Sequence, residues 1–296
     1  MKILILGGSG MLGHRLWINL SQTHETWVTV HGEGSEFPNV PEFPKKYIRP
    51  HVDALVAEQV TRAIVSVEPT LVINCIGLVK QNPLAKDPFS VISLNALLPH
   101  RVALVCLAAK IRMIHISTDC VFSGKKGRYV ETDPSDADDL YGRTKFLGEV
   151  NYPHTVTLRT SIIGRELKTH HGLIEWFLAQ KETIRGYKKA IYTGFTTDEV
   201  SRIILNHVIP RTDLSGVYHV SSDPISKYDL LMLVKEAFRR DLTILPDEDF
   251  VCDRSLNSTR FRGMTGYKPP AWIEMVDELK RNSSSYDPLG GQQNAP

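Results

Sequence analysis

The stretch that decides the fold is residues 2–13, which read KILILGGSGMLG. The apolar run Lys2–Leu6 predicts a buried strand, and the apolar spacing over Met11–Leu20 predicts a helix. Between them lies a GxxGxxG turn formed by Gly7, Gly10 and Gly13. Glycine permits a tight turn and a close approach to a pyrophosphate, and the N–H groups of the following helix attract phosphate. We therefore predict a dinucleotide site at these three glycines together with Met11 and Leu12.

Strand-like runs alternate with helical segments through the rest of the first half. Strands are expected at 27–30, 70–75, 112–117 and 155–159, and helices at 53–67, 88–109 and 141–150. Such alternation implies right-handed crossovers and a parallel sheet that is covered on both faces. The predicted fold class is α/β, a doubly wound (Rossmann) parallel sheet with a smaller, mixed carboxyl-terminal lobe. We assign residues 1–160 to the NAD(P)-binding domain.

The pattern becomes irregular after this domain. Residues 161–281 are expected to form mainly a substrate-binding lobe, with segments near 197–220 returning to the Rossmann sheet. Helices are expected at 172–180, 197–208, 227–239 and 271–280, a strand at 216–220, and irregular structure at 185–195 and 242–256. The small polar residues of 282–296 predict a disordered tail.

The charge balance of the 296 residues limits the partners of the protein. Its 35 basic and 33 acidic residues give a net charge of +2, which predicts no nucleic-acid or membrane-surface partner. No run approaches the roughly 18 apolar residues of a membrane span, and the first segment is too short for a signal peptide. The four cysteines lack metal-ligand spacing, so we expect no metal site, reduced thiols and a cytoplasmic protein.

The end of the second strand distinguishes the two nicotinamide cofactors. NAD-binding folds have an acidic residue there for the ribose hydroxyls, whereas this chain has His31, and Glu33 follows two residues later. This favours NADPH, with NADH as the alternative. His31 could contact the 2′-phosphate, with charge from Arg15, Lys45 or Lys46. Asp53 could accept a hydrogen bond from the adenine amino group, or it could simply cap the next helix.

A Thr–Tyr–Lys set carries the predicted chemistry. Thr118 ends a strand, and Tyr141 and Lys145 lie four residues apart, on one face of a helix. A phenol with a pKa of about 10 needs a nearby cation to exchange protons at neutral pH. Lys145 would supply that cation and hold the nicotinamide ribose, while Thr118 would donate a hydrogen bond to a substrate carbonyl. Hydride could then attack the polarised carbonyl as Tyr141 delivers the proton.

These motifs resemble the extended short-chain dehydrogenase/reductases, and within them the dTDP-4-dehydrorhamnose reductase-like branch. The resemblance rests on residues 7–13, 117–122, 141–145 and 159–161, and it spans about 1–280. It implies a sugar-nucleotide reductase of deoxysugar and polysaccharide biosynthesis, which reduces a 4-keto group with Thr118, Tyr141 and Lys145 as its catalytic triad. It also implies that the cofactor is lined by Cys75, Ile76 and Gly77, and that Asn95 either relays protons or is a satisfied buried amide.

Substrate contacts are expected beyond the triad. The resemblance points to Phe195, Arg254 and Asn257 in the second lobe, and to Cys120 beside the triad. Further cations could pair with the diphosphate of a sugar nucleotide: Arg165, Lys188, Lys189 and Arg260. The sequence is compatible with a homodimer.

Two alternatives to a simple reductase stay open. Cys120 falls where the GDP-fucose synthase branch has a cysteine used in epimerisation, so an epimerase-reductase is one alternative, with His170 or His171 as partner. A small residue packed at a strand end would explain Cys120 equally well. A non-catalytic NADP-binding regulatory subunit is the other alternative, although such a protein can dispense with the triad. Dehydration lacks its acid/base pair, because Cys120 replaces the glutamate that would follow Asp119.

Overall fold

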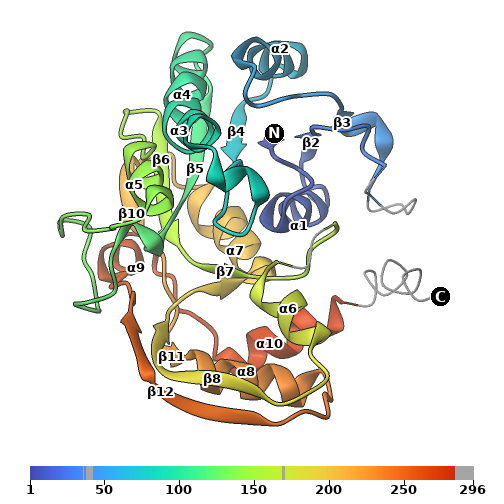
Figure 1. Ribbon diagram of the computed structural model, residues 1–296. Helices are drawn as coiled ribbons and strands as arrows, with labels where there is room; N and C mark the ends of the chain where they lie inside the picture. Colours follow the sequence, from blue (N-terminus) through green and yellow to red (C-terminus); the bar gives the residue numbers. More distant parts are fainter. Residues whose placement is uncertain (36, 38–42, 169–170, 284–296) are drawn as a thin grey trace.

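A parallel sheet of seven strands forms the larger part of the molecule (Figure 1). The computed structural model describes residues 1–35, 37, 43–168 and 171–283. The strand order is β10-β6-β5-β4-β1-β2-β3, and each neighbouring pair is parallel. The strands are β1 (Lys2–Leu6), β2 (Glu25–Thr29), β3 (Ile48–Arg49), β4 (Leu71–Asn74), β5 (Arg112–Thr118), β6 (Thr155–Thr160) and β10 (Gly216–His219).

Helices cover both faces of this sheet. Ile3 and Ile5 of β1 belong to a core cluster with α1 (Met11–Leu20) and α7 (Thr197–Ile203), whereas Leu4 and Leu6 belong to a second cluster with α2 (Ala57–Val67) and α4 (Leu98–Ala108). Alternate residues of a strand point to opposite faces, so the sheet has one core on each side. The predicted doubly wound fold is confirmed.

One long helical stretch crosses the second face. It consists of α3 (Pro88–Ile92), a π-helical turn at Ser93–Leu97, and α4. Within the described residues, this stretch of Pro88–Ala108 is long and apolar enough to span a membrane by length and composition alone. Its residues Leu98, Val102 and Cys106 pack in the second core cluster. A core helix of a globular fold passes the same test.

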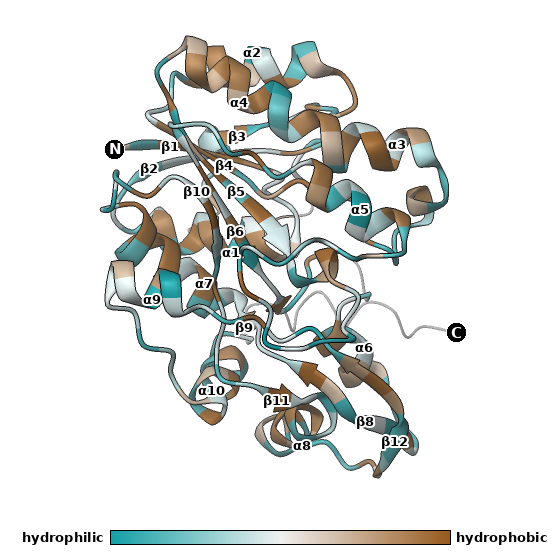
Figure 2. Ribbon diagram, turned by 90° about the vertical axis from the view of Figure 1, so that its left-hand side faces the viewer, coloured by the Kyte–Doolittle hydropathy of each residue, from teal (hydrophilic) through white to brown (hydrophobic). Residues whose placement is uncertain are grey.

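The second lobe is built around a three-stranded sheet of order β11-β8-β12 (Figure 2). Its strands are β8 (Ile184–Tyr192), β11 (Ile225–Ser226) and β12 (Ile244–Asp253). The lobe also contains the short pair β7 (Ile162–Ile163) and β9 (Phe195–Thr196), with helices α6 (Leu173–Ala179), α8 (Lys227–Ala237) and α10 (Trp272–Arg281), whereas α9 (Thr259–Thr265) packs against β10 of the large sheet. The strand expected at 216–220 is β10, which pairs with β6 in the large sheet.

The expectation of irregular structure at 185–195 and 242–256 was wrong. These segments contain most of β8 and β12, which pair in parallel with a register shift between Asp247 and Val251. β12 is largely exposed, and β8 mixes buried with exposed residues, its buried positions including the small residues Gly186 and Ala190; both strands carry several charges, and Pro246 lies within β12. Their sequences therefore lack the apolar alternation that marks a half-buried strand. The tail beyond 283 lies outside the described residues.

Candidate active site

The glycine turn has the geometry that a dinucleotide requires. Gly7 has a φ of +83°, in the region that favours glycine, and its amide N–H donates to Thr29 Oγ1 at 3.1 Å. A β-carbon on Gly13 would lie 2.1 Å from the carbonyl oxygen of Gly7, so only glycine lets α1 begin this close to the turn. Gly10 precedes α1 without a side-chain cap. No side chain of the N-cap therefore occupies the first N–H groups of α1, as expected of a helix start that binds phosphate.

The segment after β4 lies between the glycine turn and the predicted lysine. Ile76 packs against the turn, because a β-carbon on Gly7 would lie 3.0 Å from Ile76 Cγ1. A β-carbon on Gly77 would lie 3.7 Å from both Lys145 Nζ and Asn95 Oδ1. Residues 74–77 thus connect the phosphate end of the site with its catalytic end.

Asn95 holds this segment in place. Its side chain is fully buried in the π-helical turn, where Oδ1 accepts from the Leu78 amide at 2.7 Å and Nδ2 donates to the Leu78 carbonyl at 3.0 Å. The same amide group reaches Thr144 Oγ1 at 3.5 Å. Of the two alternatives for Asn95, the structure supports the satisfied buried amide.

The three triad residues come from β5 and from α5 (Leu140–Leu147). Lys145 Nζ donates to the carbonyl of Ile116 on β5 at 2.8 Å. Burial lowers the pKa of Lys145 to about 8, and the negative field of Glu149 opposes that shift. Burial raises the pKa of Tyr141 above its usual range, and a hydrogen bond with the Thr118 side chain partly offsets this. Thr118 and Tyr141 therefore meet, with Lys145 one helical turn further along α5.

Two contacts fix the start of α5. Asp139 is the N-cap, and its Oδ1 accepts from the Gly142 amide at 2.8 Å. Gly142 is needed because a β-carbon there would lie 2.2 Å from the carbonyl oxygen of Cys120. Lys80 pairs with Asp139, and its Nζ lies 5.7 Å from the centroid of the Tyr141 ring. Lys80 escaped the sequence analysis because it belongs to no motif.

Cys120, which follows Thr118 closely in the chain, is in contact with Arg254 of the second lobe. Arg254 Nη1 is 3.8 Å from Cys120 Sγ, and Arg254 Nε donates to the carbonyl of Phe122 at 2.8 Å. Burial, with the adjacent Asp119 carboxyl, raises the pKa of Cys120 to about 12. The thiol is therefore neutral near pH 7. The structure thus brings Arg254 from the second lobe to the predicted catalytic residues.

Two predicted substrate residues are placed elsewhere. The expectation for Phe195 was wrong: its side chain is fully buried in the first core cluster, with its ring centroid 6.0 Å from that of Tyr267. Asn257 has a local role, because its Oδ1 accepts from the Thr259 amide at the start of α9. Proximity in the chain to a substrate loop did not reveal which way either side chain faces.

Other candidate cations already have partners. Arg165 pairs with Glu175, Lys189 with Glu248, and Arg260 Nη1 donates to the carbonyl of Val217. The Lys188 ammonium lies 5.3 Å from the ring centroid of Tyr228. His171 is exposed, and its amide donates to Glu166, while His170 lies outside the described residues.

The adenosine side of the site lies beside β2 and β3. His31 Nε2 is 4.0 Å from Asp53 Oδ2, and both side chains are exposed. Asp53 does not cap α2, which begins four residues later, but its Oδ1 accepts from the Leu55 amide. Arg15 was a wrong candidate for the 2′-phosphate, because its buried guanidinium pairs with Asp198.

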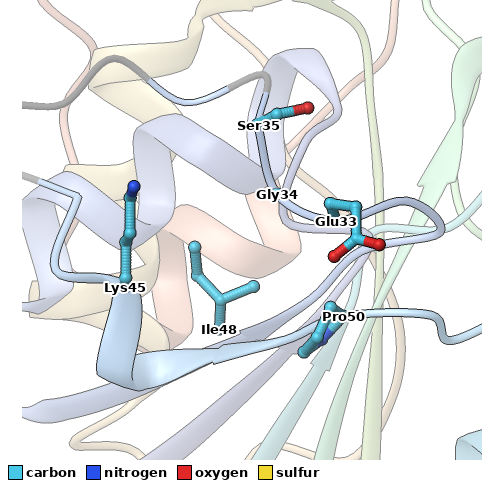
Figure 3. Close-up of a pocket in the computed structure, with 6 residues that line it drawn as sticks. All are labelled: Glu33, Gly34, Ser35, Lys45, Ile48 and Pro50. Atoms are coloured by element: carbon cyan, nitrogen blue, oxygen red, sulfur yellow. The ribbon is translucent and has the colours of Figure 1, made fainter.

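A surface pocket of about 370 Å³ lies next to this edge (Figure 3). Lys45 and Glu33 lie on opposite sides of it in Figure 3. Its lining residues are Glu33, Gly34, Ser35, Lys45, Ile48 and Pro50. The loop after the second strand is where doubly wound folds bind the adenosine ribose, and the pocket that Lys45 lines lies beside it. In the ranges that the structure describes, no group of three His, Cys, Asp or Glu side chains could hold a metal ion, and all four cysteines are free.

A doubly wound sheet that places such a triad beside its glycine turn is that of an extended short-chain dehydrogenase/reductase. A family model described as the RmlD substrate binding domain matches residues 1–279, and the chain belongs to this family. This chain is 30% identical over 147 residues to a dTDP-4-dehydrorhamnose reductase of Streptomyces griseus. The match spans 49% of this chain and 43% of that protein. The chain is 27% identical over 259 residues to a probable low-salt glycan biosynthesis reductase of Haloferax volcanii, covering 83% of each.

A solved structure has the same fold over nearly the whole length. The dTDP-4-dehydrorhamnose reductase of Bacillus anthracis, in complex with NADP, matches with a TM-score of 0.77 and 20% identity. The match covers 95% of this chain and 99% of that one. At this identity the similarity shows the fold alone.

Proposed function

We propose that the protein is an NADPH-dependent reductase of a 4-keto group on a nucleotide-activated deoxysugar, with NADH as the alternative cofactor. The observation that carries this proposal is the placement of Thr118, Tyr141 and Lys145 beside the glycine turn, with residues 74–77 between the two. The names of the relatives, a dTDP-4-dehydrorhamnose reductase and a glycan biosynthesis reductase, support the same substrate class.

The glycine turn fits the cofactor, because Gly13, where a β-carbon would lie 2.1 Å from the Gly7 carbonyl oxygen, lets α1 begin directly at the turn, so that its first N–H groups lie next to it. Bound NADPH supplies the hydride for the reaction. The Thr118 hydroxyl donates a hydrogen bond to the substrate carbonyl oxygen, and Tyr141 donates the proton that this oxygen needs. The Lys145 ammonium stabilises the phenolate that remains. With its pKa at about 8, Lys145 is still mostly protonated at pH 7.

The substrate side has one cation close to the triad. Arg254 is in contact with Cys120 and is aligned by the carbonyl of Phe122. An arginine there is suited to a diphosphate or to a sugar oxygen of a sugar nucleotide. We infer that the second lobe contributes to substrate binding through Arg254, while Phe195 is a residue of the hydrophobic core.

The two alternatives receive less support. An epimerase needs a group that removes a proton from carbon, and the neutral, buried thiol of Cys120 is poorly suited to it. A regulatory subunit can dispense with the triad, whereas this chain keeps it. We also propose that the protein acts in the cytoplasm, and a homodimer is its proposed assembly.

Turnover of a 4-keto sugar nucleotide tests the proposed function directly. The purified protein is expected to oxidise NADPH when given a 4-keto-6-deoxy sugar linked to dTDP, UDP or GDP, and one nucleotide should be preferred. The reaction is followed by the loss of NADPH absorbance and by mass spectrometry of the product, which gains two hydrogens. Cofactor binding without turnover of any of these substrates would contradict the proposal.

The position of Lys45 in the pocket beside β3 predicts that this residue distinguishes NADPH from NADH. Lys45→Ala should weaken NADPH binding about fivefold, because an exposed lysine contributes one screened, charge-assisted contact to the 2′-phosphate. NADH affinity should not change. Titration by the fluorescence of the reduced cofactor measures both.

Lys46→Ala is the matched control, because the Lys46 ammonium lies over the ring of Tyr47 and does not line the pocket. Equal losses for NADPH and NADH in Lys45→Ala would mean that Lys45 does not contact the 2′-phosphate.

A further inference from the structure

A buried ion pair lies behind the triad and has no part in the mechanism above. Glu149 follows Lys145 by four residues, and its Oε1 accepts from Ser117 Oγ and from Arg159 Nε, each at 2.7 Å. Its Oε2 accepts from Arg159 Nη2, also at 2.7 Å. The two charged side chains are only 5% and 4% exposed. The carboxylate thus joins the end of α5 to β5 and β6.

His219 contacts the side of the Arg159 guanidinium that does not face Glu149. Arg159 Nη1 is 3.1 Å from His219 Nε2, and His219 Nδ1 is 3.0 Å from the carbonyl oxygen of Tyr129. Burial, together with the nearby Arg159, lowers the pKa of His219 to about 3. The ring is therefore neutral near pH 7, so that Nδ1 donates to Tyr129 while Nε2 accepts from Arg159. This arrangement leaves the guanidinium little freedom to turn away from Glu149.

Besides Tyr141 on the same helix, three titratable groups surround Lys145. They are Glu149 after α5, Cys75 directly after β4 and His115 on β5. Burial raises the pKa of Cys75 to about 12 and lowers the pKa of His115, so both are neutral near pH 7. Of these three groups, Glu149 is the one that bears a negative charge towards the lysine.

The cost of such a pair argues for a role beyond stability. Removing two charges from water is expensive, and a buried ion pair often stabilises a fold no better than apolar residues of the same size. Here the carboxylate of the pair is held by Ser117 of β5, and the Lys145 ammonium is held by the carbonyl of the adjacent Ile116, so the two charged groups are anchored side by side on one strand.

We propose that Glu149 is the positioning residue of Lys145: Ser117, Arg159 and His219 hold its carboxylate so that the lysine stays charged and directed towards the cofactor end of the site. This rests on the role of Lys145 in the proposed function. Glu149 is not proposed to touch substrate or cofactor. It acts through the lysine.

The test measures the protonation of Lys145 itself, without any substrate. In protein labelled with ¹³C-lysine, the Lys145 signal is assigned by its loss in Lys145→Arg, and its titration is followed by NMR. Glu149→Gln should move the midpoint down by about one pH unit, since a nearby negative charge has been removed. The basic limb of the kcat/KM profile should move with it.

Asp198→Asn is the matched control, because it removes the carboxylate of another buried ion pair, that with Arg15. It should lower the melting temperature and leave the Lys145 midpoint unchanged. An unchanged Lys145 titration midpoint in Glu149→Gln would overturn the proposal. The reductase function is tested separately, by the turnover assay.

A second pair of variants applies if Glu149→Gln does not fold. His219→Leu keeps both charges but removes the acceptor for Arg159, and it should lower kcat about fivefold with KM for the sugar nucleotide unchanged. His219→Gln should restore kcat, because its amide can both accept from Arg159 and donate to Tyr129. Full kcat in His219→Leu, or no rescue by glutamine, would count against the positioning role.

Discussion

Tyr141→Phe is expected to lower kcat by about 1,000-fold, the usual contribution of a general acid. The substitution removes the proton donor and leaves the ring in its place on α5. The hydroxyl makes a hydrogen bond with the Thr118 side chain, so its loss should change the fold little. NADPH affinity and melting temperature should therefore remain close to those of the unchanged protein. Stopped-flow measurement of NADPH oxidation at saturating substrate provides the rate.

A second buried tyrosine supplies the control. Tyr267 donates to Glu199 Oε1 at 2.7 Å, within the core and away from the triad. Tyr267→Phe should reduce stability and keep the rate, which is the reverse of the pattern for Tyr141. If Tyr141→Phe kept more than about a tenth of the rate, the proton would have another source and the assignment of the general acid would be wrong.

The first half of the fold could be predicted because the apolar residues of its strands face two hydrophobic cores, one on each side of the sheet. Ile3 and Ile5 face one layer of helices, and Leu4 and Leu6 face the other. A strand that is buried on both faces has a continuous apolar sequence. In this half of the chain, helices follow such strands. In β8 and β12 this relation fails, because β12 is mostly exposed and β8 places charged residues between its few buried ones, so neither strand has a continuous apolar sequence.

In the candidate site too, the features that depend on neighbouring residues could be predicted, whereas the contacts between residues far apart in the chain could not. The spacing of Tyr141 and Lys145 follows from the helix, and the glycine spacing follows from the turn, so a motif is enough for both. Lys80 meets Asp139 across 59 residues, and Ser117 meets Glu149 across 32. Contacts of that kind depend on how the sheet brings its strand ends together, which a pattern along the chain does not contain.

Gly13→Ala is expected to weaken NADPH binding by about 100-fold or more, the effect of misplacing binding groups by about 1 Å. The new methyl group would lie 2.1 Å from the Gly7 carbonyl oxygen and 2.9 Å from its carbon. Both are backbone atoms, so no side chain can rotate to make room. Helix α1 must move away from the turn, and its N–H groups then lose their alignment on the pyrophosphate. Calorimetric titration with NADPH measures the loss.

The same substitution at two other glycines provides a series of NADPH affinities with which Gly13→Ala can be compared. Gly263 lies in α9 with no atom within 4 Å of its potential β-carbon, so Gly263→Ala should leave binding unchanged and stabilise the helix slightly. Gly10 has its nearest neighbour at 3.4 Å, and Gly10→Ala should fall between the two. The expected order of NADPH affinity is therefore Gly263→Ala, then Gly10→Ala, then Gly13→Ala. If Gly13→Ala bound NADPH as tightly as Gly263→Ala, the close approach of α1 to the turn could not be what holds the cofactor phosphates.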